Sequence, residues 1–261
     1  MMVGRVIYGE KKEKSTCPPD APVVLEVRGL NRGNVVKDVS FRLRKGEILG
    51  FSGLMGAGRT ETARAVYGAD RRDSGEILIN GKRVDIKEPI DAVKNGICYL
   101  SEDRKQYGLM LIKSVKENTV LASLDDFIRN GFIDDKKSSE VAAEYNDRLA
   151  TKTPSMEQSL RNLSGGNQQK VIVARWLLKN SDIFIFDEPT RGIDVGAKSE
   201  MYRLMEDLAA QGKSIIMISS ELQEIQRLSD RVVVMCEGRI TGELDIADAT
   251  QENIMALATK R

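Results

Sequence analysis

Five short runs of apolar residues constrain the fold of this chain more than any other feature. Several lack the alternation of apolar and polar residues that marks a strand with one face in water. The runs are Ile48–Ser52, Ile97–Leu100, Ile183–Phe186, Ile215–Ile218 and Val232–Met235. Strands that are apolar on both sides need cover on both faces, which is typical of a parallel sheet between helices. We therefore predict an α/β protein with a central, mostly parallel sheet.

A second layer is predicted near the N-terminal side of this sheet. Glu76–Ile79 and Lys82–Val84 flank Asn80-Gly81, and Asn-Gly accepts the positive φ angles of a type I′ hairpin turn. This pattern predicts an antiparallel β layer in addition to the parallel sheet.

Helical patterns lie between the strands, mainly in an inserted helical subdomain from about 108 to 163. Ser114 and Glu117 have the spacing of a capping box. The box precedes an apolar series made of Val120, Leu121, Leu124 and Ile128. Further apolar stripes are Val141, Ala142, Tyr145 and Leu149, and then Met201, Leu204, Met205 and Leu208, with Gly212 as the expected stop.

Composition excludes several classes of protein. The chain has 261 residues and a formal net charge of +1, so nothing favours a nucleic-acid partner. No apolar run approaches the roughly 18–20 residues that span a bilayer, and the first residues lack a signal-peptide pattern. Histidine is absent, so no step of the chemistry uses an imidazole of this chain. Cys98 and Cys236 lie in apolar runs and are expected to be buried and reduced, whereas residues 1–22 read as a polar linker with little core.

The segment Gly53–Thr60 has the spacing of a P-loop and lies between a predicted strand and a predicted helix. In such a loop the main-chain N–H groups of Gly53, Gly56, Ala57 and Gly58 face phosphate oxygens, and the helix N-terminus adds a favourable dipole. Thr60 is then the expected ligand of Mg²⁺. Arg59 occupies the position where the motif has lysine. The alternative is a glycine-rich turn without a ligand.

The apolar run Ile183–Phe186 ends in two acids, Asp187 and Glu188. Asp187 is placed to hold Mg²⁺ through a water molecule, and Glu188 to orient or polarise the attacking water. The alternative is a strand that simply ends at two solvated carboxylates.

The most specific motif is a Ser-Gly-Gly turn that opens a helix. It consists of Ser164, Gly165, Gly166, Asn167 and Gln168. A hydroxyl and free N–H groups at a helix N-terminus suit an anion, although an ordinary N-cap has the same residues.

This turn resembles the LSGGQ signature of ATP-binding cassettes, and Asp187-Glu188-Pro189-Thr190 follows it at the spacing of that family. Gly192-Ile193-Asp194 resembles the D-loop of the same family. The resemblance to the family covers residues 23–261. Five segments are most similar to the second cassette of ribose-type monosaccharide importers, namely Gly53–Thr60, Ser101–Lys105, Leu163–Lys170, Asp187–Lys198 and Ser219–Glu221. Met2–Arg5 resembles the end of a first cassette.

The resemblance implies a P-loop NTPase fold, ATP and Mg²⁺ as ligands, and a peripheral place on the cytoplasmic face of the cell membrane. It implies three partners: a first cassette in the same polypeptide, membrane permease subunits and, indirectly, a sugar-binding protein. Ser164–Gln168 would complete the first cassette's nucleotide site.

Four departures predict a degenerate nucleotide site of this cassette's own. Arg59 replaces the P-loop lysine, and Glu102 replaces the Q-loop glutamine that reaches metal and water. Ser220 stands at the switch histidine. No aromatic residue lies between Tyr8 and Phe41, so the base would be covered only by Val35, Val36 or Arg32. The implied catalytic residues are Glu188, Glu102 and Ser220, and the implied metal ligands are Thr60, Asp187 and Glu102.

Two other functions compete with that of a transport ATPase half. One is a nucleotide-binding module with a regulatory or structural role and little turnover. The other is a soluble cassette ATPase that acts on DNA or ribosomes, which the near-neutral charge and the lack of a long coiled-coil or zinc-binding insertion disfavour. Nothing in the sequence identifies the sugar.

Overall fold

The computed structural model describes residues 11–260, which form two compact units. Unit 1 contains the described residues through Tyr99, then Asp182–Glu188, and the chain from Met205 onward. Unit 2 contains Leu100–Ser181 and Pro189–Leu204, and so includes the segment 108–163 that we predicted to be helical. No helix among residues 11–260 has both the length and the apolar character that crossing a membrane requires.

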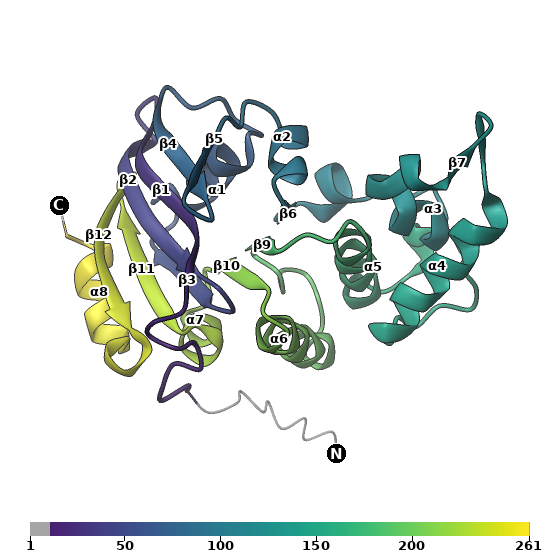
Figure 1. The fold of residues 1–261 in the computed structure, drawn as a ribbon. Coiled ribbons are helices and arrows are strands. Elements are labelled where there is room, and N and C mark those ends of the chain that lie inside the picture. Colours follow the sequence, from purple (N-terminus) through teal and green to yellow (C-terminus); the bar gives the residue numbers. More distant parts are fainter. Residues whose placement is uncertain (1–10, 261) are drawn as a thin grey trace, which may run out of the picture. The chain divides into compact units, whose positions relative to one another are not determined.

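A six-stranded sheet lies at the centre of unit 1, in the order β12-β11-β3-β10-β9-β6 (Figure 1). Its strands are β3 (Ile48–Gly53), β6 (Ile97–Leu100), β9 (Ile183–Asp187), β10 (Ser214–Ile218), β11 (Arg231–Cys236) and β12 (Arg239–Asp245). β11, β3, β10 and β9 pair in parallel, and β12 pairs antiparallel with β11. All five predicted strands are therefore confirmed, and β9 and β10 are buried along their whole length.

Helices connect these strands. In unit 1 they are α1 (Arg59–Tyr67), α2 (Pro89–Lys94), α7 (Leu222–Leu228) and α8 (Gln251–Ala258). α6 (Val195–Ala210) begins in unit 2 and ends in unit 1. It stops before Gly212, whose φ of 84° only glycine adopts without strain, as the sequence predicted.

A four-stranded antiparallel sheet forms the second layer of unit 1, in the order β2-β1-β4-β5. Its strands are β1 (Val23–Arg32), β2 (Val36–Arg44), β4 (Ser74–Ile79) and β5 (Lys82–Val84). The turn between β4 and β5 has φ of 49° at Asn80 and 76° at Gly81, which confirms the predicted hairpin.

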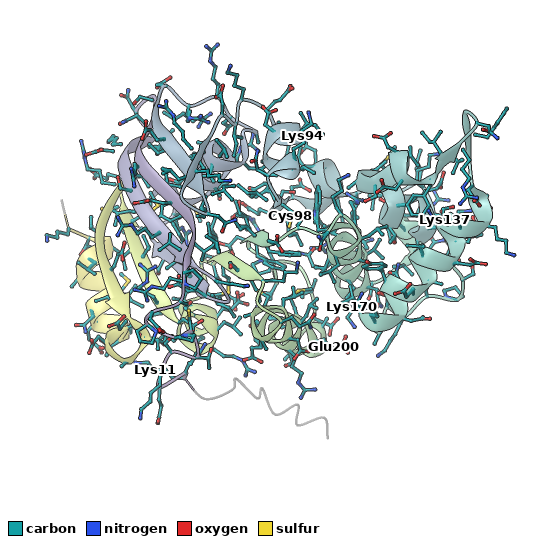
Figure 2. The ribbon with its side chains drawn as sticks, in the orientation of Figure 1. Lys11, Lys94, Cys98, Lys137, Lys170 and Glu200 are labelled. Carbon is teal, nitrogen blue, oxygen red and sulfur yellow. The ribbon has the colours of Figure 1, made fainter. Side chains whose placement is uncertain are left out.

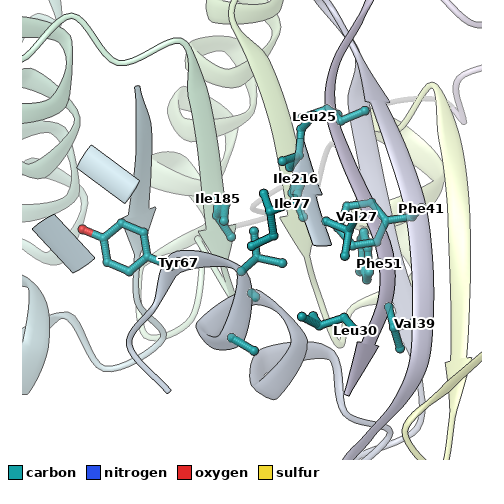
Figure 3. Close-up of a cluster of buried hydrophobic side chains, with 14 of the residues drawn as sticks. Leu25, Val27, Leu30, Val39, Phe41, Phe51, Tyr67, Ile77, Ile185 and Ile216 are labelled. Carbon is teal, nitrogen blue, oxygen red and sulfur yellow. The ribbon is translucent and has the colours of Figure 1, made fainter. Parts of the chain in front are cut away.

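One apolar core holds the two sheets of unit 1 together. Leu25 and Ile77 of the antiparallel sheet and Ile185 and Ile216 of the parallel sheet belong to the same buried cluster (Figure 3). The rings of Phe41 and Phe51 meet edge to face, with centroids 5.0 Å apart. This packing gives the end of β3, where the P-loop begins, a rigid support.

Unit 2 is built around α3 (Val115–Val120), α4 (Asp135–Arg148) and α5 (Gly165–Leu178). The predicted capping box is present, since Ser114 and Glu117 bond to each other's main-chain N–H groups. A small core of Val120, Phe127 and Ala142 joins these helices.

One predicted stripe is wrong beyond Val120. Residues Leu121–Phe127 form a 3₁₀ segment in which buried Ser123 has non-helical φ and ψ. Ile128 then starts β7 (Ile128–Arg129), which forms a hairpin with β8 (Phe132–Ile133). The apolar spacing alone did not reveal this break because Leu124 still packs against the core while Ile128 is exposed.

The described part of the predicted linker is held on unit 1. One carboxylate oxygen of Asp230 accepts hydrogen bonds from the Lys12 ammonium at 2.8 Å and from the Ser15 hydroxyl and the Thr16 main-chain N–H at 3.0 and 2.7 Å. The other oxygen accepts from the main-chain N–H of Ile48 at 2.9 Å. Residues 12–16 are therefore attached to unit 1 through Asp230, and the role of residues 1–22 as a linker stays a prediction. The predicted likeness at Met2–Arg5 lies outside the described residues.

The three cysteines also differ from expectation in part. Cys98 is buried as predicted, Cys236 is only half-buried, and Cys17 is buried within the segment predicted to be a linker. Burial raises the pKa of the Cys17 thiol to about 11.

Replacing Asp230 should destabilise unit 1. Burial alone would raise the pKa of Asp230, but the Ile48 N–H and the Lys12 ammonium outweigh it, so the pKa lies below its usual range. Asp230→Ala should lower the free energy of unfolding by roughly 2–4 kcal/mol at pH 7, because buried donors lose their acceptor. Denaturant unfolding would measure this loss.

The exposed neighbour Asp245 provides the control, and Asp245→Ala should change little. The difference between wild type and Asp230→Ala should shrink in acid as the pH falls through the lowered pKa, since the carboxylate then becomes protonated. Equal stability of the two alanine variants at pH 7 would contradict the anchoring role of Asp230.

Candidate functional site

The predicted P-loop joins β3 to α1, as its sequence context requires. Gly56 and Gly58 have φ of 78° and 98°, and Gly58 is the N-cap of α1 without any side-chain cap. A Cβ on Gly58 would lie 2.6 Å from the carbonyl oxygen of Val35, so the loop tolerates only glycine there. The uncapped first amides of α1 and the open side of Gly56 leave room for an anion.

Asp187 lies at the end of β9 and is fully buried. Its two carboxylate oxygens accept hydrogen bonds from the Thr60 hydroxyl at 3.1 Å and from the Tyr99 hydroxyl at 2.6 Å. The predicted metal ligands Thr60 and Asp187 are thus brought together, while Tyr99, on β6, was not predicted as a site residue.

Glu188 follows with a strained backbone φ of 50°, and its N–H donates to the carbonyl of Ile218 at 2.9 Å. The Ser220 hydroxyl donates to the Glu188 carboxylate at 3.0 Å. The Arg59 guanidinium donates to the carbonyl of Ser219 at 2.6 Å. Arg59 therefore supports the loop that carries Ser220, a task that the sequence did not indicate.

Burial dominates the electrostatics of these groups. It raises the pKa of Asp187 and of Glu188, even though the hydrogen bonds and the charge of Arg59 act in the opposite direction. It also lowers the pKa of Arg59. Two ionised carboxylates in a poorly solvated site are stabilised by a nearby cation. A metal ion bound together with phosphate would supply such a cation.

The donor set fits Mg²⁺ only in part. Hydroxyl and carboxylate oxygens are suitable ligands, and Thr60 and Asp187 provide one of each. Among residues 11–260 no group of three or more Asp, Glu, His or Cys side chains could hold a metal. A bound Mg²⁺ would therefore take its remaining ligands from phosphate and water.

The signature-like turn lies in unit 2, at the start of α5. The Ser164 hydroxyl accepts from the main-chain N–H of Asn167 at 3.4 Å and from its side-chain amide at 2.9 Å. Gly166 and Gln168 are buried, and the Gln168 amide donates to the carbonyl of Leu160 at 3.2 Å. Ser164 is exposed, whereas buried Gln168 supports the turn through its hydrogen bond to Leu160. The turn therefore serves as the N-cap of α5 and also leaves a hydroxyl open to solvent, where an anion could bind.

Glu102 also lies in unit 2, where it forms an ion pair with Arg191. Its predicted roles as metal ligand and catalytic residue stay predictions. Of the residues expected to cover a base, Val36 is fully buried and Arg32 pairs with Asp70 at 3.3 Å, which leaves the half-exposed Val35.

A hollow of about 310 Å³ lies beside the P-loop in unit 1. It is lined on one side by Leu54–Ala57 and on the other by Cys236, Glu237, Ala258 and Thr259. Met55, at the tip of the loop, is almost completely exposed.

Tyr99 is the clearest residue that the sequence analysis missed. Its ring packs against Tyr67 of α1 with centroids 5.4 Å apart, and burial raises its pKa, so the hydroxyl stays protonated as a donor. The predicted strand Ile97–Leu100 placed Tyr99 near the end of a strand of the central sheet. That position is a usable signal, because ligands bind at the carboxyl ends of parallel strands.

Asp187→Asn should raise the free energy of unfolding of the ligand-free protein at pH 7 by on the order of 1 kcal/mol. The reason is that the substitution removes a buried negative charge whose raised pKa shows it to be unfavourable. Asparagine keeps both contacts, since its amide donates to Thr60 and its oxygen accepts from Tyr99. A raised carboxyl pKa means that stability present at low pH is lost as the pH rises through that pKa.

The gap between variant and wild type should therefore widen as the pH rises from the ordinary carboxyl pKa through the raised pKa of Asp187, and should then stay constant, which unfolding curves over a pH series would show. Asp245→Asn serves as the exposed control. A variant that is less stable than wild type at pH 7 would refute the expectation.

Comparison with known proteins supports the fold and places the family. The family model described as ABC transporter matches residues 36–191, more than half of the chain. An ATP-binding cassette of an ABC transporter in its ADP conformation superposes with a TM-score of 0.75 at 18% identity, over 92% of this chain and 99% of the other. A nucleotide-free cassette gives 0.74 at 20% identity, over 91% and 96%. At these identities the likeness shows the P-loop ABC ATPase fold alone.

Curated relatives are much more similar in sequence. "Putative ribose/galactose/methyl galactoside import ATP-binding protein 1" of Burkholderia lata is 58% identical over 265 residues, which cover 100% of this chain and 51% of that protein. The ribose import ATP-binding protein of Lacticaseibacillus paracasei is 51% identical over 258 residues, or 99% of this chain and 51% of that protein. The chain thus spans about half the length of these relatives, and it belongs to the ATP-binding cassettes of the ABC transporter family.

Proposed function

We propose that this chain is the ATP-binding half of an importer for a monosaccharide of the ribose type. The observation that carries the proposal is that one cassette contains both a P-loop, with Thr60 against Asp187, and a separate Ser164–Gln168 turn. The names of the relatives support the substrate class, and their roughly twofold greater length supports a pair of cassettes in one polypeptide.

At its own P-loop the chain would bind ATP with the main-chain N–H groups of Gly53–Thr60. Thr60 and Asp187 would hold Mg²⁺, which supplies charge neutralisation on the phosphates when it is bound. Tyr99 and Thr60 keep the Asp187 carboxylate in place. Glu188 would orient the attacking water, with Ser220 as its hydrogen-bond donor.

We further propose that this site turns over slowly. The Arg59 guanidinium is engaged by the Ser219 carbonyl, whereas the usual lysine offers a compact charge to phosphate. Ser220 offers a neutral hydroxyl where the family has an imidazole. Phosphoryl transfer depends on positioning and electrostatics, so these replacements are expected to slow it.

The Ser164–Gln168 turn would complete the site of a partner cassette, whose γ-phosphate would meet the exposed Ser164 hydroxyl and the first amides of α5. On this proposal the chain works at the cytoplasmic face of the membrane with permease subunits, and a sugar-binding protein acts through them. A regulatory or structural module with little turnover is the second candidate. The same four departures from the family pattern favour this second candidate. Measuring single-site ATP turnover of the isolated chain would distinguish the two candidates.

Nucleotide binding should be weak and show little preference for the base. The glycine loop, Thr60 and Asp187 suffice for Mg²⁺–nucleotide, but the half-exposed Val35 offers little stacking surface. Calorimetry of the chain with Mg²⁺–ATP and Mg²⁺–GTP would measure both affinities. Tight binding with strong selectivity for adenine would count against this account of the base site.

The two motifs should contribute unequally to turnover. In the two-cassette protein reconstituted with its permease, Ser164→Ala should reduce sugar-stimulated ATP hydrolysis, on the order of 10²-fold, because the transferred phosphoryl group loses a donor. Glu188→Gln should cause a much smaller loss, since it affects the site already lacking the lysine and histidine. Abolished turnover in Glu188→Gln together with a silent Ser164→Ala would reverse the assignment. Equal and complete losses would mean that both sites hydrolyse ATP.

A further inference from the structure

Arg104 connects two loops of unit 2 that are distant in sequence. Its guanidinium donates to the carbonyl of Arg191 at 2.9 Å and to that of Gly192 at 3.4 Å. Its Nε donates to the side-chain oxygen of Gln168 at 3.4 Å. One side chain therefore bonds both to the start of the signature helix α5 and to the loop that precedes α6.

The guanidinium also lies directly against the signature turn. A Cβ on Gly165 would come within 2.6 Å of the Arg104 Nη2 atom and 3.2 Å of the Gly192 carbonyl oxygen. The second glycine of the turn is equally close-packed, since a Cβ on Gly166 would meet that of Ala197 at 2.7 Å. The two glycines thus let the turn, the guanidinium and the start of α6 approach one another.

The neighbouring residues reinforce this connection. Glu102 pairs with the side chain of Arg191, so the segment that carries Arg104 reaches the same loop twice. Asp103 caps the short helical segment Arg104–Gly108 by accepting from the N–H groups of Lys105 and Gln106 at 3.1 and 3.0 Å, which fixes the backbone from which Arg104 extends.

The helices behind the loops are joined as well. Lys170 of α5 is buried and forms an ion pair with Glu200 of α6 at 2.8 Å (Figure 2). The Asp194 carboxylate accepts from the N–H of Ala197 at 3.0 Å and holds the start of α6. With the helices fixed in this way, the Arg104 contacts set the position of the turn relative to the Arg191–Gly192 loop.

We propose that Arg104 is a positioning residue for the signature turn, and this inference rests on the proposed function. Arg104 holds Ser164–Gln168 against Arg191–Gly192, so the turn meets a partner cassette's nucleotide in one geometry. The planar fork is required because three acceptors on two loops must be reached at once, and a lysine ammonium is a single point donor on a flexible stem.

The test compares Arg104→Met, Arg104→Lys and the matched control Lys105→Met. Lys105 is the adjacent exposed cation, so its replacement removes the same charge without touching either loop. In the reconstituted two-cassette protein, Arg104→Met should lower kcat for sugar-stimulated ATP hydrolysis about 10- to 100-fold, as misplacement of a catalytic group does. KM for ATP should stay within about threefold, because Arg104 itself does not contact nucleotide. Arg104→Lys should be intermediate and Lys105→Met should match wild type.

Hydrogen exchange of the chain itself gives a readout that needs no activity. Amides of Ser164–Gln168 and of Arg191–Asp194 should exchange faster in Arg104→Met, while β3 and β10 keep their protection. Unchanged exchange in both loops, or a rise in KM with kcat preserved, would overturn the proposal.

If Arg104→Met does not fold, Arg104→Lys serves as the test. A lysine variant identical to wild type in exchange and kcat would refute the need for the planar guanidinium. If the wild-type protein shows no sugar-stimulated hydrolysis, the proposed function fails while the exchange result still decides the role of Arg104.

Discussion

The site in unit 1 depends on the buried carboxylate of Asp187. It accepts from Thr60 at the start of α1 and from Tyr99 on β6, and it terminates β9. Three elements that are far apart in sequence are thus held by one side chain. The burial that gives this geometry also makes the negative charge costly, as its raised pKa shows. The apolar core beneath the sheet, rather than the carboxylate, has to provide the stability that offsets this cost.

Asp230 is also a buried aspartate, but its carboxylate is stabilised in the charged form, unlike that of Asp187. It is about as buried as Asp187, yet donors from residues 12–17 and from Ile48 surround it, and its pKa lies below the usual range. The difference lies in the partners: Asp230 receives a lysine ammonium and main-chain N–H groups, whereas Asp187 receives two hydroxyls. One carboxylate is therefore saturated by the protein, and the other retains capacity for a cation from outside.

The sequence predicted most of the fold because its main signals are local. Uninterrupted apolar runs, the Asn80-Gly81 turn and the Ser114–Glu117 box depend on a few adjacent residues and are all present. Motif spacing predicted the P-loop and also Thr60 and Asp187 as metal ligands, and the structure brings these two side chains together. The roles of Arg104 and Asp230 were not predictable in this way, since each depends on partners that only tertiary structure brings close. For Tyr99 the predicted strand gave the position, but not the hydrogen bond to Asp187. The break at Ser123 was missed for a related reason, because an apolar series can continue across a change of helix type.

The half-buried position of Cys236 has a practical consequence for chemical labelling. Cys17 and Cys98 are buried, and the raised pKa of Cys17 keeps it as an unreactive thiol at neutral pH. A thiol-directed reagent would thus react first with Cys236, which lines the same hollow as Leu54–Ala57. These 261 residues can therefore carry a single fluorophore or spin label next to the P-loop, without any of their cysteines being replaced.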